Sequence, residues 1–316
     1  MGNPWGSIKS SLKAFRDQGI LEERIRNCEE RLEKLTYLYQ STKYATAEKN
    51  QHYLVKLHFV NMMGEGNVGD YVCGPYWYFS NFFSDCTCYF HKLQKIDFDQ
   101  MSNGDWVIVG GGGLINHEES WNELIYRCQH ITGHVILWGV GENTHFGEKC
   151  QPFDYGKVLL SGIRDKKETY YKSEFVPCAS CMLPQLKYVY KIRREIGVIE
   201  HDSYPITEFG YEKINNSRDI NTVLQFIGES ETIISNSYHA IYWATLMKKK
   251  VIIYDQWSSK FDHLPYKQPI YTGNLSQDLE NALVYENSLQ ECRNINLQFA
   301  GKIRKIMDDE IQKMTG

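Results

Sequence analysis

The feature that most constrains the fold is a repeat of short apolar runs, each ending in a glycine-rich or polar turn. In the first half of the chain these runs are YLVKLHFV (53–60), DWVIVGGGGLIN (105–116), HVILWGVGEN (134–143) and VLLSGIRD (158–165). The pattern restarts after MLPQLKYVYKIRR with EIGVIEHD (195–202), ETIIS (231–235) and KKVIIYD (249–255). Strands that alternate with helices in this way predict parallel sheets covered on both faces.

The restart predicts two Rossmann-like halves joined near residues 188–193. We expect an α/β fold in which two such domains face a cleft, with an N-terminal helical extension. The expected parts are an extension over 1–45, domains over 46–190 and 191–285, and a C-terminal helix over 286–316. Ligands of open α/β sheets bind beyond the carboxyl ends of the strands, which places the site in the cleft.

Residues 8–44 are predicted to be helical. Apolar side chains recur there at alternating spacings of three and four, at Leu21, Ile25, Cys28, Leu32, Leu35 and Tyr39. This heptad seam is typical of a short coiled coil, which would make the protein a homo-oligomer. A helix that packs on its own domain explains the spacing equally well.

Composition excludes several classes of protein. The 316 residues carry a net charge of −4, so no broad basic face is expected and nucleic acid is excluded as a partner. No apolar run reaches the length of a transmembrane helix, and the first residues lack a signal-peptide core. The nine cysteines show no disulfide framework, which indicates a cytoplasmic protein. Cys178 and Cys181 have C-x-x-C spacing but no second pair, so we predict no metal site.

Four predicted strand ends carry glycine or polar residues, at 66–70, 110–113, 139–142 and 162–165. Glycine lets the backbone approach a ligand, and a helix that follows such a turn attracts anions. The GGGGLIN turn is not a G-x-G-x-x-G motif, and no acidic residue ends a second strand, so a dinucleotide cofactor is not predicted.

Three side chains at these ends suit an anionic ligand. Arg164 follows a strand and could bind a carboxylate or phosphate through two hydrogen bonds, or could pair with Asp165 on the surface. His239 lies in the first turn of the predicted helix YHAIYWATLM, as a reactive or a structural histidine. Lys260 lies beyond the next strand, where a solvated lysine is the simplest interpretation.

These motifs together resemble the polysaccharide pyruvyl transferase family. The resemblance covers GNVGD, VGGGGLI, GVG, GIRD, CASCMLP and SNSYHAIYWATLMKKKVIIYDQWSSKF in that order, over roughly 60–262. It implies a GT-B-like fold, phosphoenolpyruvate (PEP) as donor substrate, no cofactor, and a free or lipid-linked saccharide of a surface-polysaccharide pathway as acceptor. That acceptor would place the protein in the cytoplasm, including the inner face of the membrane.

The resemblance associates Arg164 and His239 with PEP. Many members have Arg-Leu-His where this chain has Ser237-Tyr238-His239, so one cation expected near the phosphate is missing. Lys260, Ser237 and the helix N-terminus are the available replacements. We also assign Tyr238 and the glycines Gly112 and Gly113 to PEP binding.

For catalysis we expect His239 to be the acid, because a bound anion would raise its pKa, and Asp70 to be the base or a stabiliser of positive charge. Asp70 could instead merely shape its turn. Asn67, Glu142 and His201 are predicted to face the acceptor. Two alternatives remain. One is a nucleotide-sugar glycosyltransferase of the same fold, for which Glu229 and Glu231 are poor ribose ligands. The other is a non-catalytic protein that binds glycans or scaffolds an assembly through its N-terminal helix.

Overall fold

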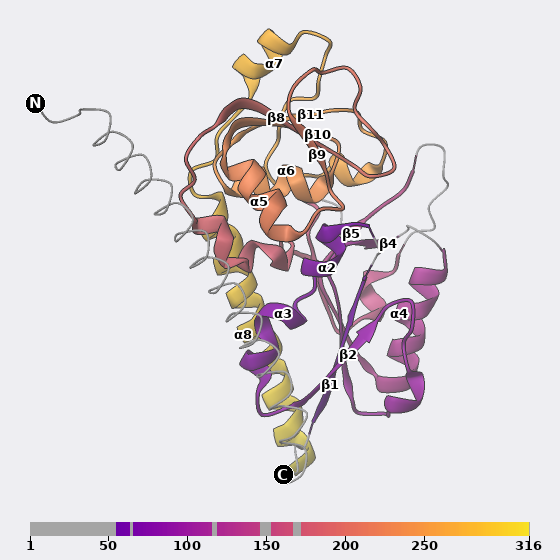
Figure 1. Ribbon diagram of the computed structural model, residues 1–316. Coiled ribbons are helices and arrows are strands. Elements are labelled where there is room, and N and C mark those ends of the chain that lie inside the picture. Colours follow the sequence, from indigo (N-terminus) through magenta and orange to yellow (C-terminus); the bar gives the residue numbers. More distant parts are fainter. Residues whose placement is uncertain (1–54, 64–65, 116–118, 146–152, 167–171, 316) are drawn as a thin grey trace, which may run out of the picture. The chain divides into compact units, whose positions relative to one another are not determined.

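Two parallel β-sheets organise the part of the chain that the structure describes (Figure 1). This computed structural model describes residues 55–63, 66–115, 119–145, 153–166 and 172–315. The predicted helix over 8–44 and its heptad seam lie outside the described residues. The described residues belong to one compact unit, which contains both sheets.

The first sheet has seven strands, in the order β2-β1-β3-β5-β6-β7, and β4 pairs with β5. All its pairings are parallel. The strands are β1 (Lys56–Asn61), β2 (Thr87–Lys92), β3 (Trp106–Gly110), β4 (Gly113–Ile115), β5 (His134–Glu142), β6 (Leu160–Ile163) and β7 (Glu174–Phe175). The mixed α/β class and the parallel sheet are therefore confirmed, in agreement with a Rossmann-like arrangement.

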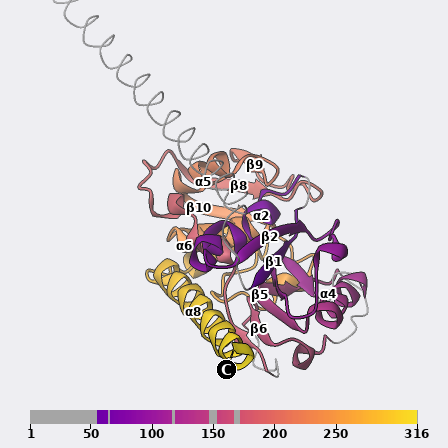
Figure 2. The same cartoon turned by 90° about the horizontal axis from the view of Figure 1, so that it is seen from below.

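Alternation along the strands divides the core of this sheet between two helices. Val107 and Val109 of β3 belong to the cluster that includes α4 (Glu119–Thr132), whereas Trp106 and Ile108 belong to the cluster of α8 (Ser288–Thr315). Successive side chains of a strand point to opposite faces, so each helix covers one face. Figure 2 shows α4 and α8 on either side of the strands. The C-terminal helix was predicted within two residues of its observed ends.

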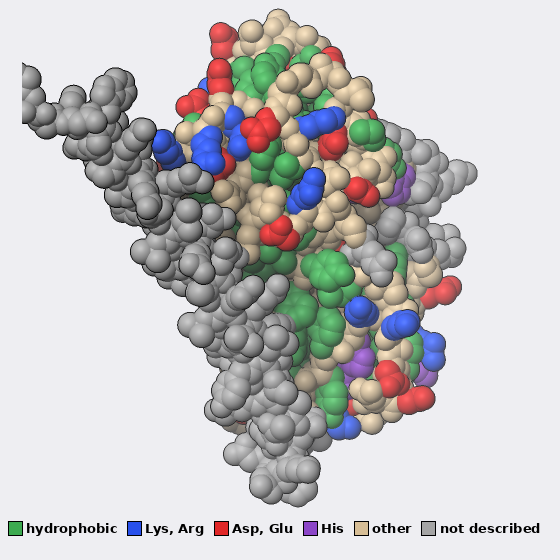
Figure 3. All heavy atoms as spheres, viewed as in Figure 1, with side chains coloured by type: hydrophobic (Ala, Val, Ile, Leu, Met, Phe, Trp, Pro, Cys, Tyr) green, Lys and Arg blue, Asp and Glu red, His purple; other side chains and the backbone are tan. Residues whose placement is uncertain are grey.

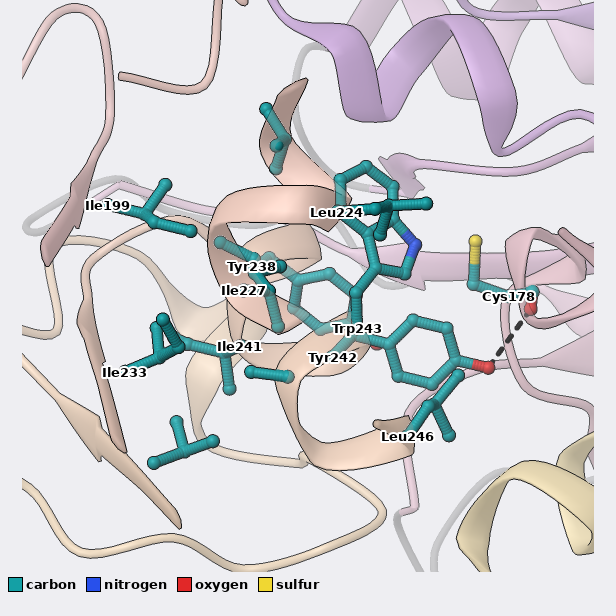
Figure 4. Packing of buried hydrophobic residues seen from close by; sticks show 14 of the residues in the cluster. Cys178, Ile199, Leu224, Ile227, Ile233, Tyr238, Ile241, Tyr242, Trp243 and Leu246 are labelled. Carbon is teal, nitrogen blue, oxygen red and sulfur yellow. Dashed lines mark hydrogen bonds between the residues drawn. The ribbon is translucent and has the colours of Figure 1, made fainter. Parts of the chain in front are cut away.

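The second sheet has four parallel strands in the order β11-β10-β8-β9. They are β8 (Arg194–Glu200), β9 (Lys213–Asn215), β10 (Ser230–Ser235) and β11 (Lys250–Ile253), with α5 (Ile220–Gly228) and α6 (Tyr238–Leu246) as connecting helices. Every residue of α6 is buried. Figure 4 shows its Ile241, Tyr242 and Leu246 packed within a cluster of buried side chains. A helix that is apolar all round belongs in a core.

Short elements fill the remaining described segments. They are α2 (Val68–Val72), α3 (Tyr76–Phe79), α7 (Leu275–Asn281) and the 3-10 turns η1 (Ser80–Phe83), η2 (Phe98–Gln100), η3 (Tyr155–Lys157), η4 (Ala179–Met182), η5 (Pro184–Lys187) and η6 (Ser259–Phe261). The segment 188–193, where the two halves were expected to join, contains neither helix nor strand.

The turns at the carboxyl ends of the two sheets are joined by backbone hydrogen bonds. The Val68 amide donates to the Asn216 carbonyl (3.0 Å), and the Ser259 amide donates to the Thr144 carbonyl (2.9 Å). On the face drawn in Figure 3, acidic and basic side chains are mixed over the second sheet, and hydrophobic side chains gather over α2 and α3.

Candidate functional site

A cavity of about 250 Å³ opens where the turns of the two sheets meet. The turns of the first sheet supply Met62, Asn67, Asp70, Gly113, Leu114, Asn143, His145 and Arg164. The second half supplies His201, Ser203, Tyr204, Ser237, Tyr238, His239, Trp257 and Lys260. The cavity therefore lies beyond the carboxyl ends of the strands, where a ligand of an open α/β sheet is expected.

The structure brings together most of the side chains that the sequence proposed. Gly112 and Glu142 are the exceptions, because neither lines the cavity. Gly112 precedes β4, and its carbonyl accepts a hydrogen bond from the Gly141 amide (2.9 Å), so it holds the turn in place. Glu142 ends β5, and its amide donates to Asp165 Oδ2 (2.6 Å). The placement of the other residues leaves their roles as predictions.

Arg164 is buried beside the cavity with part of its guanidinium unsatisfied. It is 2% exposed, and its Cζ lies 3.8 Å from the centroid of the Tyr238 ring. Its Nε and Nη1 have no hydrogen-bond partner among the described residues, and the nearest Asp165 oxygen is 3.9 Å from Nε. The Arg164–Asp165 pair is buried, so the interpretation as a surface pair is wrong. A buried charge with open donors fits an anionic ligand.

Glycines leave the space that this guanidinium occupies. A Cβ added at Gly141 would lie 2.6 Å from Arg164 Nε, and one at Gly113 would lie 3.1 Å from Nη2. The predicted reason for glycine at these strand ends was close backbone approach to a ligand. At Gly141 and Gly113 the closest described neighbours are the arginine, Asp165 and Asn143.

Lys260 is a second buried cation. It lies in η6, is 9% exposed, and its Nζ is 3.6 Å from the centroid of the Trp257 ring. No acceptor within hydrogen-bonding distance of its ammonium is found among the described residues. Burial lowers the pKa of Lys260 to about 7, with Arg164 adding to the effect and Asp70 opposing it. The expectation of an ordinary solvated lysine is therefore wrong.

Asp70 brings a carboxyl group to the same cavity. It lies in α2, which begins after Asn67, whose side chain accepts from the Gly69 amide (3.1 Å). Burial raises the pKa of Asp70 to about 6, and Lys260 and then Arg164 limit the rise. A carboxyl group with a pKa near neutrality can exchange a proton during a reaction.

His239 occupies the first turn of α6 and is 5% exposed. Its Nε2 lies 3.7 Å from the Cys178 sulfur, and Gly69 packs so closely on Nδ1 that any Cβ there would overlap the ring. Burial, then the charges of Arg164 and Lys260, lowers the pKa of His239 well below its usual value. The histidine is therefore neutral at pH 7 in the cavity as it stands, and both ring nitrogens have protein neighbours.

The α6 N-terminus adds backbone donors to the two cations. Ser237 is its N-cap, but the side chain makes no capping hydrogen bond, and Tyr238 and His239 are the first helical residues. The first amides of a helix lack intrahelical acceptors and favour an anion. The helix is held in place by Tyr242, whose hydroxyl donates a hydrogen bond to the Cys178 carbonyl (3.0 Å), drawn as a dashed line in Figure 4.

Aromatic rings form another wall of the cavity. Tyr204 stacks on Trp257 with 4.4 Å between ring centroids, and His145 and His201 also contact the Trp257 ring. The Trp257 indole donates to the Asn236 carbonyl (3.0 Å), which fixes its plane. Tyr204 is 40% exposed, so it presents part of its ring to solvent. Burial lowers the pKa of His201 to about 4, which makes it neutral at pH 7.

Several lining residues were not identified from the sequence. Asn143, His145, Ser203 and Tyr204 follow the same strand ends as predicted residues, so the signal was present in their position. Trp257 also lines the cavity, whereas Trp106, at the start of β3, is 2% exposed in the core and stacks on His134. Cys178 does not line the cavity. Its sulfur contacts Nε2 of His239, and burial raises the pKa of its thiol.

Neither a three-residue metal-binding group nor Glu229 and Glu231 lie at the cavity among the described residues. Across the described ranges, His, Cys, Asp and Glu side chains nowhere gather in threes suited to a metal ion. Glu229 forms ion pairs with Arg193 and Arg194, and with Glu231 it lies at the start of β10, at the opposite end from the cavity. Every helix in the described part of the chain is too short or too polar to pass through a bilayer.

Comparisons with known proteins find a likeness among solved structures. No protein-family model matches the sequence, and no curated protein matches it. Among solved structures, the chain is similar to the crystal structure of a functionally uncharacterized protein from Klebsiella pneumoniae subsp. pneumoniae NTUH-K2044. The TM-score is 0.46 at 14% sequence identity, over 71% of this chain and 89% of that chain.

Proposed function

We propose that this chain is a PEP-dependent pyruvyltransferase that acts on a saccharide. The observation that carries the proposal is the buried guanidinium of Arg164, whose Nε and Nη1 have no hydrogen-bond partner among the described residues. Lys260 and the N-terminus of α6 line the same cavity. The resemblance of the sequence to polysaccharide pyruvyl transferases supplies the identity of the anion.

PEP carries a carboxylate and a phosphate on adjacent sides of one small carbon frame. We assign the planar fork of Arg164 to the carboxylate, because two parallel hydrogen bonds match its geometry. Lys260 and the first amides of α6 would hold the phosphate. These two groups take the place of the arginine that many family members carry at position 237.

We assign proton transfer to Asp70 in preference to His239. The pKa of Asp70 is already raised to about 6 by burial, and a bound trianion would raise it further, so the carboxyl group carries a proton near neutrality. The nitrogens of His239 face Gly69 and Cys178. His239 then serves to pack α6 against α2, which sets the direction of the helix N-terminus.

The reaction balances with these groups. The Asp70 proton goes to the methylene carbon of PEP, while a sugar hydroxyl bonds to the adjacent carbon and returns its own proton to Asp70. The carbon–oxygen bond to phosphate then breaks, and the electron pair leaves with the phosphate. A second sugar hydroxyl closes the ketal and gives its proton to the phosphate. Lys260 and the first amides of α6 stabilise the negative charge that accumulates on the leaving phosphate.

The acceptor would approach from the aromatic wall. Tyr204 offers an apolar ring face, and the neutral His201 offers hydrogen bonding, a combination that suits a pyranose. In this proposal residues 46–190 and 191–285 act as two Rossmann-like domains of a GT-B-like protein that faces the cytoplasm. The acceptor is a free or lipid-linked saccharide of surface-polysaccharide synthesis.

One observation also fits a nucleotide-sugar glycosyltransferase, because the exposed Tyr204 ring could stack on a nucleobase. However, Glu229 and Glu231 lie at the far end of β10 from the cavity, so neither can bind a ribose there. A non-catalytic glycan-binding protein would have no use for two buried cations beside a carboxyl group of raised pKa.

The test is incubation of the full chain with PEP and a panel of galactosides, mannosides and hexosamines. Phosphate release and a product mass that exceeds the acceptor by one pyruvate less one water would support the proposal. Calorimetric titration with PEP, UDP-sugars and GDP-sugars provides the comparison. Tight binding of a nucleotide sugar with no measurable binding of PEP would refute the proposal.

A further inference from the structure

The segment that leads from η5 into β8, Lys187 to Arg193, displays apolar side chains to solvent. We call these residues the crossover segment. Val189 is 100% exposed, Tyr188 is 52% exposed and Ile192 is 41% exposed. Single exposed apolar residues are ordinary, but three within five positions form a patch that requires an explanation.

One residue of the crossover segment anchors it to the protein. Residues 188–193 are in neither helix nor strand, and the ring of Tyr190 packs so closely on Gly228 that any Cβ there would overlap it. The residues on either side of this anchor, Val189 and Lys191, are both exposed.

Basic residues flank the exposed valine along the chain. Lys187 and Lys191 are exposed, and neither has an ion pair among the described residues. Arg193 contacts Glu229 (Nε–Oε1 3.3 Å), yet 65% of its side chain is exposed. Lys249 adjoins the segment through its hydrogen bond to the Gly228 carbonyl (2.7 Å). Glu195, in β8, is the next exposed carboxylate along the chain.

We propose that the crossover segment docks the protein on an anionic lipid surface. In this arrangement Val189 enters the boundary between headgroups and acyl chains, and Tyr188 and Ile192 lie beside it. The lysines of the segment bind lipid phosphates. A folded protein partner fits less well, since a protein interface uses roughly 20–30 residues a side and the crossover segment is one short stretch. A bilayer needs no shape complementarity. This inference is independent of PEP chemistry.

The test is co-sedimentation of the full chain with phosphatidylcholine vesicles, with and without phosphatidylglycerol. We expect binding only to the vesicles that contain phosphatidylglycerol, and we expect salt to weaken it. Val189→Asp should abolish binding. Lys187→Gln and Lys191→Gln should each weaken it roughly fivefold, the factor that corresponds to one basic residue near an anionic surface.

Matched controls separate docking from general charge or apolarity. Leu283 is 54% exposed in the loop after α7, so Leu283→Asp is the control for Val189→Asp. Lys95 and Lys305 are exposed elsewhere, so Lys95→Gln and Lys305→Gln are the controls for the two lysines. All three control variants should leave vesicle binding unchanged. Because Val189 has no buried surface, its replacement should keep the thermal unfolding midpoint. Failure to bind anionic vesicles at low salt would overturn the proposal, as would binding that Val189→Asp leaves intact. Lipid-free self-association that Val189→Asp removes would assign the segment to a second copy instead.

Discussion

Two buried clusters of titratable side chains differ in how their polar atoms are satisfied. At the cavity, Arg164 and Lys260 are both buried; Nε and Nη1 of Arg164 lack hydrogen-bond partners among the described residues, and Nζ of Lys260 lies over the Trp257 ring. In the first sheet, His58 of β1 lies between His91 of β2 and Asp105, which precedes β3. Its Nδ1 is 2.9 Å from His91 Nε2, and its Nε2 is 3.2 Å from Asp105 Oδ2.

We call the second cluster, His58, His91 and Asp105, the imidazole cluster. Its side chains are joined by hydrogen bonds within the protein. Ser102 donates its amide to the same Asp105 oxygen (2.8 Å), and the three side chains of the cluster belong to residues that are at most 8% exposed. Burial lowers the pKa of His58, and lowers that of His91 to about 4. Burial and a shifted pKa therefore do not by themselves mark a site. Unsatisfied donors beside a cavity do, because a ligand can complete them.

The two clusters should differ most when each loses its carboxyl group. We expect Asp70→Asn to lower turnover by about 10²–10⁴, the range for loss of general acid–base catalysis. PEP affinity should stay the same or rise, because a negative charge leaves the cavity. His239→Gln should reduce turnover less. The measurements are steady-state phosphate release and calorimetric PEP binding. The reverse ranking would return the acid role to His239.

Asp105→Asn is the matched control for that experiment, because it makes the same chemical change in the imidazole cluster. We expect it to lower the free energy of unfolding by about 1–3 kcal/mol, the cost of weakening a buried hydrogen bond to a charged group. Turnover per folded molecule should be unchanged. A large loss of turnover in this variant would show that the imidazole cluster acts in the reaction.

A smaller effect is expected at Arg164. In Arg164→Lys the charge remains but the planar fork is lost, so the apparent Michaelis constant for PEP should rise about 10–100-fold. The constant for the acceptor should move little. Initial rates measured at varied PEP and fixed acceptor, and then the converse, separate the two. If the acceptor constant changed and the PEP constant did not, Arg164 would belong to the other substrate.

Lys260 makes the affinity for PEP depend on pH. With its pKa lowered to about 7, the ammonium is charged below pH 7 and neutral above it in the empty cavity. If the bound anion needs this charge, Lys260 must take up a proton when PEP binds above pH 7. The affinity for PEP should therefore fall up to tenfold per pH unit above about pH 7. In Lys260→Arg the charge persists, so the part of the slope that comes from Lys260 should disappear, and any slope from proton uptake by Asp70 should remain. Calorimetry across the pH range tests the slope, and an equal slope in both proteins would assign it to another group.

The two clusters also differ in how far the sequence predicts them. Parallel strands and the residues at their ends follow from local pattern, so Arg164, Ser237, His239 and Lys260 could be assigned to one region before their contacts were known. Position along the chain does not give burial, and Lys260 was therefore expected to be solvated. Glu142 and Arg164 both lie at the carboxyl end of a strand, Glu142 at the end of β5 and Arg164 directly after β6. Only Arg164 lines the cavity.

Features that depend on pairing distant segments were not predicted. The imidazole cluster joins β1, β2 and the start of β3, and β2 itself was not anticipated, because the TCYFHK sequence is short and partly polar. Trp257 and Tyr204 meet only after β8 and β11 are placed in one sheet. The helix α4 was also not predicted, although the helical spacing of Trp121, Leu124, Ile125 and Cys128 was present.

The smallest expected effect concerns the imidazole cluster and acid. His91 has a folded pKa of about 4 against 6.5 for an unperturbed histidine, so the unfolded chain binds more protons below pH 6.5. Stability should therefore fall as the pH drops from 6.5 towards 4, and the share of His91 is about 1 kcal/mol between pH 7 and about pH 5.5. His91→Gln keeps an amide that can reach His58 but does not titrate, so its unfolding free energy should depend less on pH by that amount. Urea unfolding at the two pH values measures the difference. PEP binding should be the same in both proteins, because the partners of His91 are His58 and the first sheet, and neither His58 nor His91 lines the cavity.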